Sequence, residues 1–287
     1  RSWGPVAVAD NEPSMKPLSA RALVVLSALA TFALLAAAHS ALAQAPPPPP
    51  PGAPSPVPGL TPEQAARFQT GLRAFLLRFT PQAGLGPVFN DDACSRCHAA
   101  PVAGGSSGRL VTRFGTLTSA GTFDPLERLG GSLVQDRSLL PVPGCSIPPE
   151  VVPREATVVA RRRTQPLFGL GYVDAVPDAT FETLARNQAL ASPATAGRVN
   201  RVTDVSTGQL RVGRFGWKAQ VPTLRQFSGD ALLNEQGITN PLFRDESCPQ
   251  GNCALLACNL APGLNDDGTL VSQLTDFQTM LAAPARG

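Results

Sequence analysis

The sequence is poor in the residues that complete most metal and redox sites. Its 287 residues include two histidines, two methionines, two lysines and one tyrosine. His39 and Met15 lie in an N-terminal segment with the pattern of an export signal, so the remainder of the chain contains one histidine, His98, and one methionine, Met280. A site that requires two histidines from this remainder is therefore excluded.

A strong net charge is also absent. The formal net charge is +3 at pH 7, and from Gln44 onward it is about +2. A nucleic-acid-binding domain usually carries a strongly basic surface, and the balance here is too even to indicate one. We therefore expect no nucleic acid among the partners.

The N-terminal part of the chain has the pattern of a targeting segment. Met15 and a basic start precede an apolar stretch from Ala22 to about Ala38 and an A-x-A cleavage site at 41–43. The apolar stretch is too short for a typical membrane-spanning helix. We predict a signal peptide over 15–43, a periplasmic or exported location, and no stable membrane span after cleavage. Residues 1–14 are predicted to be upstream non-coding translation.

A proline-rich segment follows the predicted signal. Residues 44–58 contain six consecutive prolines at 46–51, which is typical of a polyproline II linker. A ligand for an SH3-type domain is the functional alternative, but such partners are not expected outside a bacterial-type membrane. The globular part is then predicted over 59–287, long enough to bury a core.

Cys94-Ser95-Arg96-Cys97-His98 is a C-x-x-C-H pentapeptide, the pattern of a c-type haem attachment site. Cys94 and Cys97 fall on one face of a helical turn, where both thiols can add to the two vinyl groups of one porphyrin. His98 follows directly and can be the proximal iron ligand. The sequence therefore predicts one haem c in this chain.

Three other structures could use such a cysteine pair. A thioredoxin-like redox site needs a βαβ context, which the flanking sequence lacks. A structural zinc needs four ligands, and the sequence has no second C-x-x-C and no H-x₃₋₅-H. A disulfide across four residues would be uncommon. Haem attachment is the favoured interpretation.

Periodicity and capping residues predict several helices and one hairpin. Thr61 as N-cap and Gln64 as its capping-box partner predict a helix that runs to about Phe79. The other predictions are a short helix at the cysteine pair, helices over about 179–191, 222–236 and 270–283, and a hairpin of 198–205 with 210–215. Residues 106–150 look irregular, so long loops are left for a haem to organise.

Four separated segments together resemble one known family. They are GLGPVFNDDACSRCHAAPVAGG at 84–105, QPLFGLGYVDAVPDATF at 165–181, GRFGWKA at 213–219 and NEQGITNP at 234–241. In this order they resemble the di-haem oxidoreductases of the thiol-oxidoreductase group, which are relatives of the bacterial di-haem cytochrome c peroxidases and of MauG. The resemblance runs from about Thr61 to Ala283.

The resemblance implies two c-type haems in two cytochrome c-like helical domains in the periplasm, where the first haem meets peroxide and the second relays electrons. This chain has one C-x-x-C-H, so it resembles the N-terminal haem portion of the family. A second haem is expected in a full-length relative, and its domain is predicted to be missing here. The predicted fold class is mainly α: a cytochrome c-like haem domain with long loops and a small β-hairpin.

Several residues are candidates for the second axial position of the iron. Met280 would give a His/Met site suited to electron transfer, although a core position on the last helix is the simpler explanation for it. Lys218 and Tyr172 are weaker candidates. If none of them binds, the iron has an open position where peroxide can react.

Other candidates would surround the haem. By the resemblance, Asp174 lies where the family usually has a glutamate, so it is the predicted acid–base group for peroxide cleavage; a salt bridge to the arginines at 161–163 is the alternative. Trp217 resembles the tryptophan between the haems of related enzymes, or is a plain core residue. Arg113 and the arginines at 161–163 could hold the haem propionates, or form ordinary solvated surface.

Together these observations predict an exported c-type haem redox protein. It would be a peroxidase-like oxidoreductase that works with a periplasmic electron donor or acceptor. The alternative is a single-haem electron-carrier cytochrome c without catalytic turnover, and an exported domain without haem is the third. The remaining cysteines are expected to form two disulfides in any of three pairings: Cys145, Cys248, Cys253 and Cys258.

Overall fold

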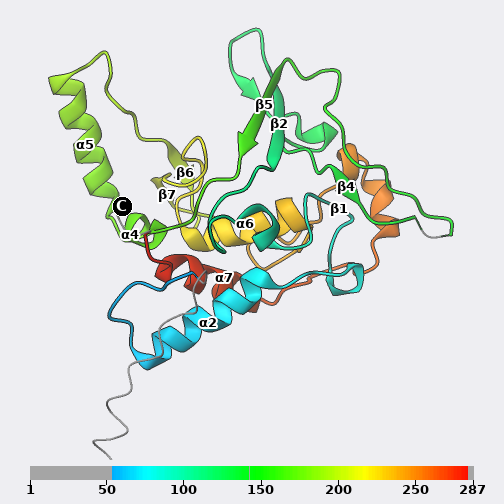
Figure 1. Ribbon diagram of the computed structural model, residues 1–287. Helices are drawn as coiled ribbons and strands as arrows, with labels where there is room; N and C mark the ends of the chain where they lie inside the picture. Colours follow the sequence, from blue (N-terminus) through cyan, green and yellow to red (C-terminus); the bar gives the residue numbers. More distant parts are fainter. Residues whose placement is uncertain (1–53, 142, 284–287) are drawn as a thin grey trace, which may run out of the picture. The chain divides into compact units, whose positions relative to one another are not determined.

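The computed structural model describes residues 54–141 and 143–283 (Figure 1). The predicted upstream residues, the predicted signal peptide and the proline run at 46–51 lie outside the described residues. In the part of the chain that is described, no helix is both long enough and apolar enough to cross a membrane.

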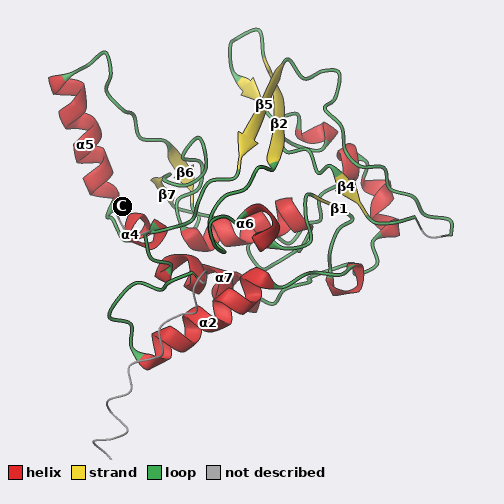
Figure 2. Cartoon of the chain, in the orientation of Figure 1, coloured by secondary structure: helices red, strands yellow, loops and turns green. Residues whose placement is uncertain are grey.

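The described chain contains both helices and short strands (Figure 2). The helices are α2 (Pro62–Leu76), α3 (Cys94–Cys97), α4 (Leu170–Asp174), α5 (Asp178–Ala191), α6 (Leu224–Gln236) and α7 (Thr269–Met280). The strands are β1 (Val88–Phe89), β2 (Leu110–Leu117), β3 (Phe123–Asp124), β4 (Arg137–Ser138), β5 (Val158–Arg163), β6 (Arg201–Thr203) and β7 (Leu210–Val212).

Helix α2 begins as the sequence predicts. The Thr61 hydroxyl accepts a hydrogen bond from the Gln64 amide at 3.2 Å, and the Gln64 side-chain oxygen accepts one from the Thr61 amide at 2.9 Å. Two amides at the helix start are thereby satisfied, as in a capping box. The helix ends at Leu76, before the predicted end at Phe79.

The main hydrophobic core lies where α2, α6 and α7 pack together. At Gly71 of α2, a Cβ would lie 2.3 Å from the Gln273 carbonyl oxygen of α7, so only glycine fits there. Phe277 of α7 is fully buried, with its ring centroid 5.4 Å from that of Phe68 and 4.7 Å from that of Phe75. These aromatic contacts join the two helices, which run side by side in Figure 1.

The strands form three small antiparallel sheets. Strand β1 pairs with β4, β6 pairs with β7, and β2 pairs with both β3 and β5. The longest ladder runs from Leu110 opposite Arg163 to Gly115 opposite Val158. The β6–β7 pair confirms the predicted hairpin, and α5, α6 and α7 lie close to their predicted ranges.

Two disulfides select one of the three pairings that the sequence leaves open. Cys145 is bonded to Cys258, and Cys248 is bonded to Cys253. The first bond joins residues 113 positions apart in the chain and so ties the loop after β4 to the segment before α7. The second closes a short loop within that segment.

The predicted fold class, a mainly α cytochrome c-like domain, is wrong. Of the described residues, 34% are in α-helices or short 3₁₀-helices and 16% lie in strands or bridges, and no all-helical cytochrome c-like core is present among them. The missed feature is the β3–β2–β5 sheet, because β2 lies in the stretch 106–150 that the sequence predicts to be irregular. Strand β2 alternates poorly, with Phe114 and Gly115 both buried, so pairing with distant β5 decides its structure.

Replacing Phe277 by alanine is expected to lower the free energy of unfolding by about 3–5 kcal/mol, because a fully buried ring is lost and a cavity is left. Urea denaturation followed by circular dichroism measures the change. Leu190→Ala is the control: Leu190 is 85% exposed, so the expected change is within about 0.5 kcal/mol. Equal losses in the two variants would contradict the packing of α2 on α7.

Candidate functional site

A cavity of about 580 Å³ lies against the C-x-x-C-H segment. Its wall includes Cys94, Cys97 and His98 and continues with residues of α2, β2, β5, α6 and α7. Cavities of roughly 300–1,000 Å³ accommodate cofactors and small ligands. These elements are far apart in the sequence, so the cavity exists only in the folded chain.

The last turn of α6 holds the loop that leads into the C-x-x-C-H segment. The Glu235 carbonyl oxygen accepts hydrogen bonds from the amides of Asn90 at 2.8 Å and Asp91 at 3.3 Å, and the Gln236 carbonyl oxygen accepts one from the Gly86 amide at 3.0 Å. A helix end leaves such carbonyls without intrahelical donors. The helix end and the loop therefore satisfy each other, which places the cysteine pair beside the cavity.

Both cysteines of the motif are free thiols in the structure. They lie on α3, a single helical turn, and the side-chain amide of Gln236 donates a hydrogen bond to the Cys94 sulfur at 3.5 Å. Burial raises the pKa of both thiols, and that of Cys97 rises to about 12. The two sulfurs are therefore neutral thiols at the edge of the cavity, separate from the disulfides.

The His98 ring also lines the cavity, with its centroid 6.0 Å from that of Phe75. Its Nδ1 lies 3.1 Å from the Gly105 carbonyl oxygen, so in the neutral ring Nδ1 donates the hydrogen and Nε2 keeps the lone pair. Burial lowers the pKa of His98 to about 4, although the carbonyls of Gly105 and Gln165 favour the protonated ring. A neutral imidazole whose Nδ1 is held by the backbone is the usual form of a metal-binding histidine.

The alternative uses of the cysteine pair fit this geometry less well. Every sheet that the described residues form is antiparallel, so they contain no βαβ unit of a thioredoxin-like site. They also contain no group of three or more His, Cys, Asp and Glu side chains that could hold a metal ion. Two free thiols, a neutral imidazole and an adjoining cavity fit a covalently attached haem.

Two carboxylates of α6, Asp230 and Glu235, face the same cavity, and burial raises the pKa of both. The Asn90 side-chain amide donates a hydrogen bond to Glu235 at 2.7 Å, and the Asn234 amide donates one to Asp230 at 3.0 Å. The positive charge of Arg113 favours the ionised form of both. Buried carboxyls with raised pKa values in a cavity are candidates for proton transfer.

Sequence reasoning did not single out Asp230 or Glu235. The signal for Glu235 was present, because the residue lies in the NEQGITNP segment that carries part of the family resemblance. The signal was not recognised because a glutamate on an amphipathic helix looks like ordinary surface. The position of its carboxylate against the cavity depends on how α6 packs.

The structure brings several predicted residues to the cavity wall. Arg113, Arg162 and Arg163 line it, whereas Arg161 does not. Trp217 lines it as well and is 52% exposed. The Trp217 indole N–H donates a hydrogen bond to the Arg163 carbonyl oxygen at 3.2 Å, and the Arg162 guanidinium carbon lies 5.8 Å from the centroid of the Trp217 ring. Trp217 is therefore a surface residue at the cavity rather than a core residue.

Other predicted residues lie outside the cavity wall. Met280 is packed in the core of α2 and α7 and is 8% exposed, while Tyr172 is 59% exposed. Of the candidates for the sixth iron ligand, Lys218 lines the cavity. Asp174 does not; its carboxylate accepts a hydrogen bond from the Leu224 amide at 3.3 Å, at the start of α6. The role of Asp174 as an acid–base group stays a prediction.

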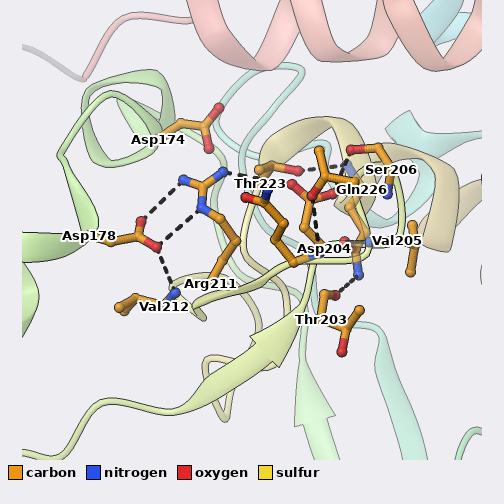
Figure 3. A network of polar contacts seen from close by, with 12 residues as sticks. Asp174, Asp178, Thr203, Asp204, Val205, Ser206, Arg211, Val212, Thr223 and Gln226 are labelled. Atoms are coloured by element: carbon orange, nitrogen blue, oxygen red, sulfur yellow. Dashed lines mark hydrogen bonds and ion pairs between the residues drawn. The ribbon is translucent and has the colours of Figure 1, made fainter.

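A polar network connects the first turn of α5 with β7 (Figure 3). Arg211 donates two hydrogen bonds to the Asp178 carboxylate, each at 3.1 Å, and Asp178 also accepts one from the Val212 amide at 2.9 Å. The hydrogen bond from Arg211 is the main reason that the pKa of Asp178 is lowered. The Asp178 carboxylate, in the first turn of α5, therefore ties that helix to the β6–β7 hairpin.

Arg214 joins this network to the cavity. Its side chain is 1% exposed, pairs with Asp178 and lies in the cavity wall. It donates hydrogen bonds to the carbonyl oxygens of Val173 and Asp174 at 3.1 Å and of Val176 at 2.7 Å. These acceptors lie at the end of α4, so one guanidinium positions α4 and α5 beside the cavity.

Comparison with known families supports a redox function for this arrangement. Residues 151–269 match the family described as "Di-haem oxidoreductase, putative peroxidase". These residues carry the di-haem oxidoreductase pattern. The family predicted from the four motifs is thereby confirmed over this range. No curated protein and no solved structure gives a significant match to the chain.

The matched range lies in the C-terminal part of the chain. It covers β5 to α6 and supplies the cavity wall from Arg162 to Gln236. It contains no C-x-x-C-H; the pentapeptide lies upstream at 94–98. The family match therefore supports a haem cofactor. It says nothing of Cys94 and Cys97, for which the support is the C-x-x-C-H motif and the adjoining cavity.

Arg214→Met is expected to lower the free energy of unfolding by about 3–5 kcal/mol, because Asp178 and the carbonyls at the end of α4 lose a buried partner. Arg186→Met is the control: Arg186 is exposed on α5, so its loss should stay within about 0.5 kcal/mol. Chemical denaturation measures both. A small effect at Arg214 would show that α4 and α5 do not depend on this guanidinium.

Proposed function

We propose that the protein is an exported, peroxidase-like oxidoreductase with haem c attached through Cys94 and Cys97 and ligated by His98. The observation that carries the proposal is the cavity of about 580 Å³ whose wall contains both free thiols and the His98 ring. The di-haem oxidoreductase match over 151–269 supports the same cofactor independently, because it covers a different part of the cavity wall.

The chain offers partners for each part of a haem. Each thiol would add across one vinyl group, so that a sulfur–carbon bond forms and the thiol hydrogen passes to the neighbouring carbon. Nε2 of His98 would bind the iron, with Nδ1 held by Gly105. Arg113 and Arg162 would hold the propionates, since guanidinium groups bind carboxylates through paired hydrogen bonds.

The bound haem would supply an iron that reacts with peroxide. The chain itself must move a proton between the two peroxide oxygens, which a positioned acid–base group can do. Glu235 is suited to this task, because it faces the cavity and its raised pKa keeps a proton available to higher pH. Asn90 holds the carboxyl in place through its 2.7 Å hydrogen bond.

The electron-carrier alternative has less support from the cavity. A closed six-coordinate haem would need a second ligand, and Met280 is packed in the core outside the cavity wall. Lys218 could still close the site, because it lines the cavity. A high-spin ferric spectrum that shifts with cyanide supports the enzyme, and a low-spin spectrum inert to cyanide supports the carrier.

Export and a periplasmic electron donor or acceptor are part of the same proposal. The pattern over 15–43 and the disulfides Cys145–Cys258 and Cys248–Cys253 support an oxidising compartment, where such bonds persist. Haem c attachment also takes place after export in bacteria with a periplasm, so the location and the cofactor are consistent with each other.

Production in a bacterial periplasm with a cytochrome c maturation system tests haem attachment. We expect a pyridine haemochrome and a protein band that stains for haem under denaturing conditions, because the thioether bonds survive unfolding. Cys94→Ala/Cys97→Ala should lose the stain. Cys145→Ala/Cys258→Ala is the matched control, because it removes a disulfide outside the cavity and should keep the haem. A stain that persists without Cys94 and Cys97 refutes the attachment.

Glu235→Gln is expected to lower peroxide turnover by about 10²–10⁴-fold at unchanged haem content, because the glutamine cannot exchange the proton. Asp174→Asn is the paired variant, and steady-state peroxidase assays with both decide between the two carboxyls. The cavity geometry predicts the large loss at Glu235. A large loss at Asp174 with normal activity at Glu235 would instead support the assignment from the family resemblance.

A further inference from the structure

A second hollow adjoins the haem cavity on the outside of the molecule. It has a volume of about 680 Å³ and is bounded by the loop 100–108, the segment 163–166 and Trp217. We call it the Trp217 groove. The segment 163–166 and Trp217 also line the cavity, so the two spaces share part of their walls. Anything bound in the groove would lie next to the haem proposed here.

The groove and its rim are positively charged. Arg163 lines the groove, Arg161 precedes it on the same strand with its side chain on the same face, and Lys218 follows Trp217; all three side chains are exposed. No carboxylate is among the residues that line the groove. Within residues 54–141 and 143–283, none of these three cations forms an ion pair.

The surface of the groove combines aromatic, apolar and cationic side chains. Trp217 is half-exposed beside it, with Arg162 over its ring, and Ala100, Pro101 and Pro166 add exposed apolar surface. Tryptophan and arginine next to a pocket are the residues that dominate the binding energy of many protein interfaces. A rim of one sign of charge selects and steers a partner of the opposite sign.

We propose that the Trp217 groove is the docking surface for a small acidic redox protein, which passes electrons singly to the haem in the adjoining cavity. This inference rests on the proposed function, because it needs a haem at Cys94, Cys97 and His98. In each encounter one electron leaves the reduced iron of the partner and reduces the ferric haem iron, and no bond is made or broken.

Stopped-flow reduction of the haem-loaded protein tests the proposal with two probes, a reduced acidic rubredoxin and a reduced basic cytochrome c. We expect the rubredoxin to react faster, and its rate constant to fall as ionic strength rises from about 10 mM to about 150 mM, where the Debye length shortens from about 30 Å to about 8 Å. Arg161→Glu should lower its rate constant by about fivefold, because Arg161 is exposed and lies outside the cavity wall.

Arg154→Glu is the matched control. It reverses the charge of an exposed side chain that lies before Val158, the first residue of β5 and the end of the strand opposite Arg163. The rate constant for this variant should stay within about twofold of that of the original protein, since Arg154 lies away from the rim of the groove. An unchanged visible spectrum and circular dichroism in all variants establish that they are folded and loaded.

The outcomes separate the docking proposal from the proposed function. Equal rates with the two probes in a haem-loaded protein, or equal losses in Arg161→Glu and Arg154→Glu, overturn the docking surface and leave the haem intact. A preference for the basic cytochrome c also overturns it. Absence of a pyridine haemochrome overturns the proposed function, and the docking surface with it.

Discussion

The site depends on the hydrogen bonds between the last turn of α6 and the loop before the C-x-x-C-H segment. The carbonyl oxygens of Glu235 and Gln236 have no partners within the helix, and the amides of Gly86, Asn90 and Asp91 have none within the loop, so each set satisfies the other. These bonds hold the cysteine pair against the helix that also carries the cavity carboxylates. The haem attachment and the proton transfer proposed for this protein would thereby depend on the same helix end.

The packing of α2 on α7 also fixes the position of the C-x-x-C-H segment. The close approach at Gly71 allows Phe277 to contact both Phe68 and Phe75, and Phe75 in turn lies beside the His98 ring. His98, the proposed iron ligand, therefore packs against the hydrophobic core. Its Nδ1 is held from the other side by the Gly105 carbonyl oxygen. A ligand fixed in this way keeps its orientation when a cofactor is bound.

Opposite charges are separated in the cavity wall. Asp230 and Glu235 come from α6, whereas Arg113 and Arg162 come from the neighbouring strands β2 and β5. The sheet that the sequence did not predict thus supplies the two cations that are proposed to hold the haem propionates. Strand β5 also carries the exposed Arg161 and Arg163, and Arg163 lines the Trp217 groove. The cavity and the groove therefore share the end of β5 as part of their walls.

The sequence by itself determined the features that depend on neighbouring residues. The C-x-x-C-H spacing, the capping box at Thr61, the end of α6 at Gly237 and the β6–β7 hairpin all arise within a few residues, and the family was recognisable from short segments. The tertiary structure alone decided the rest. Strand β2 becomes a strand by pairing with β5, and the disulfides take one of three pairings because of which loops meet. Glu235 faces the cavity and Asp174 does not, because the packing of α4 and α6 sets the direction of each carboxylate and no local pattern encodes it.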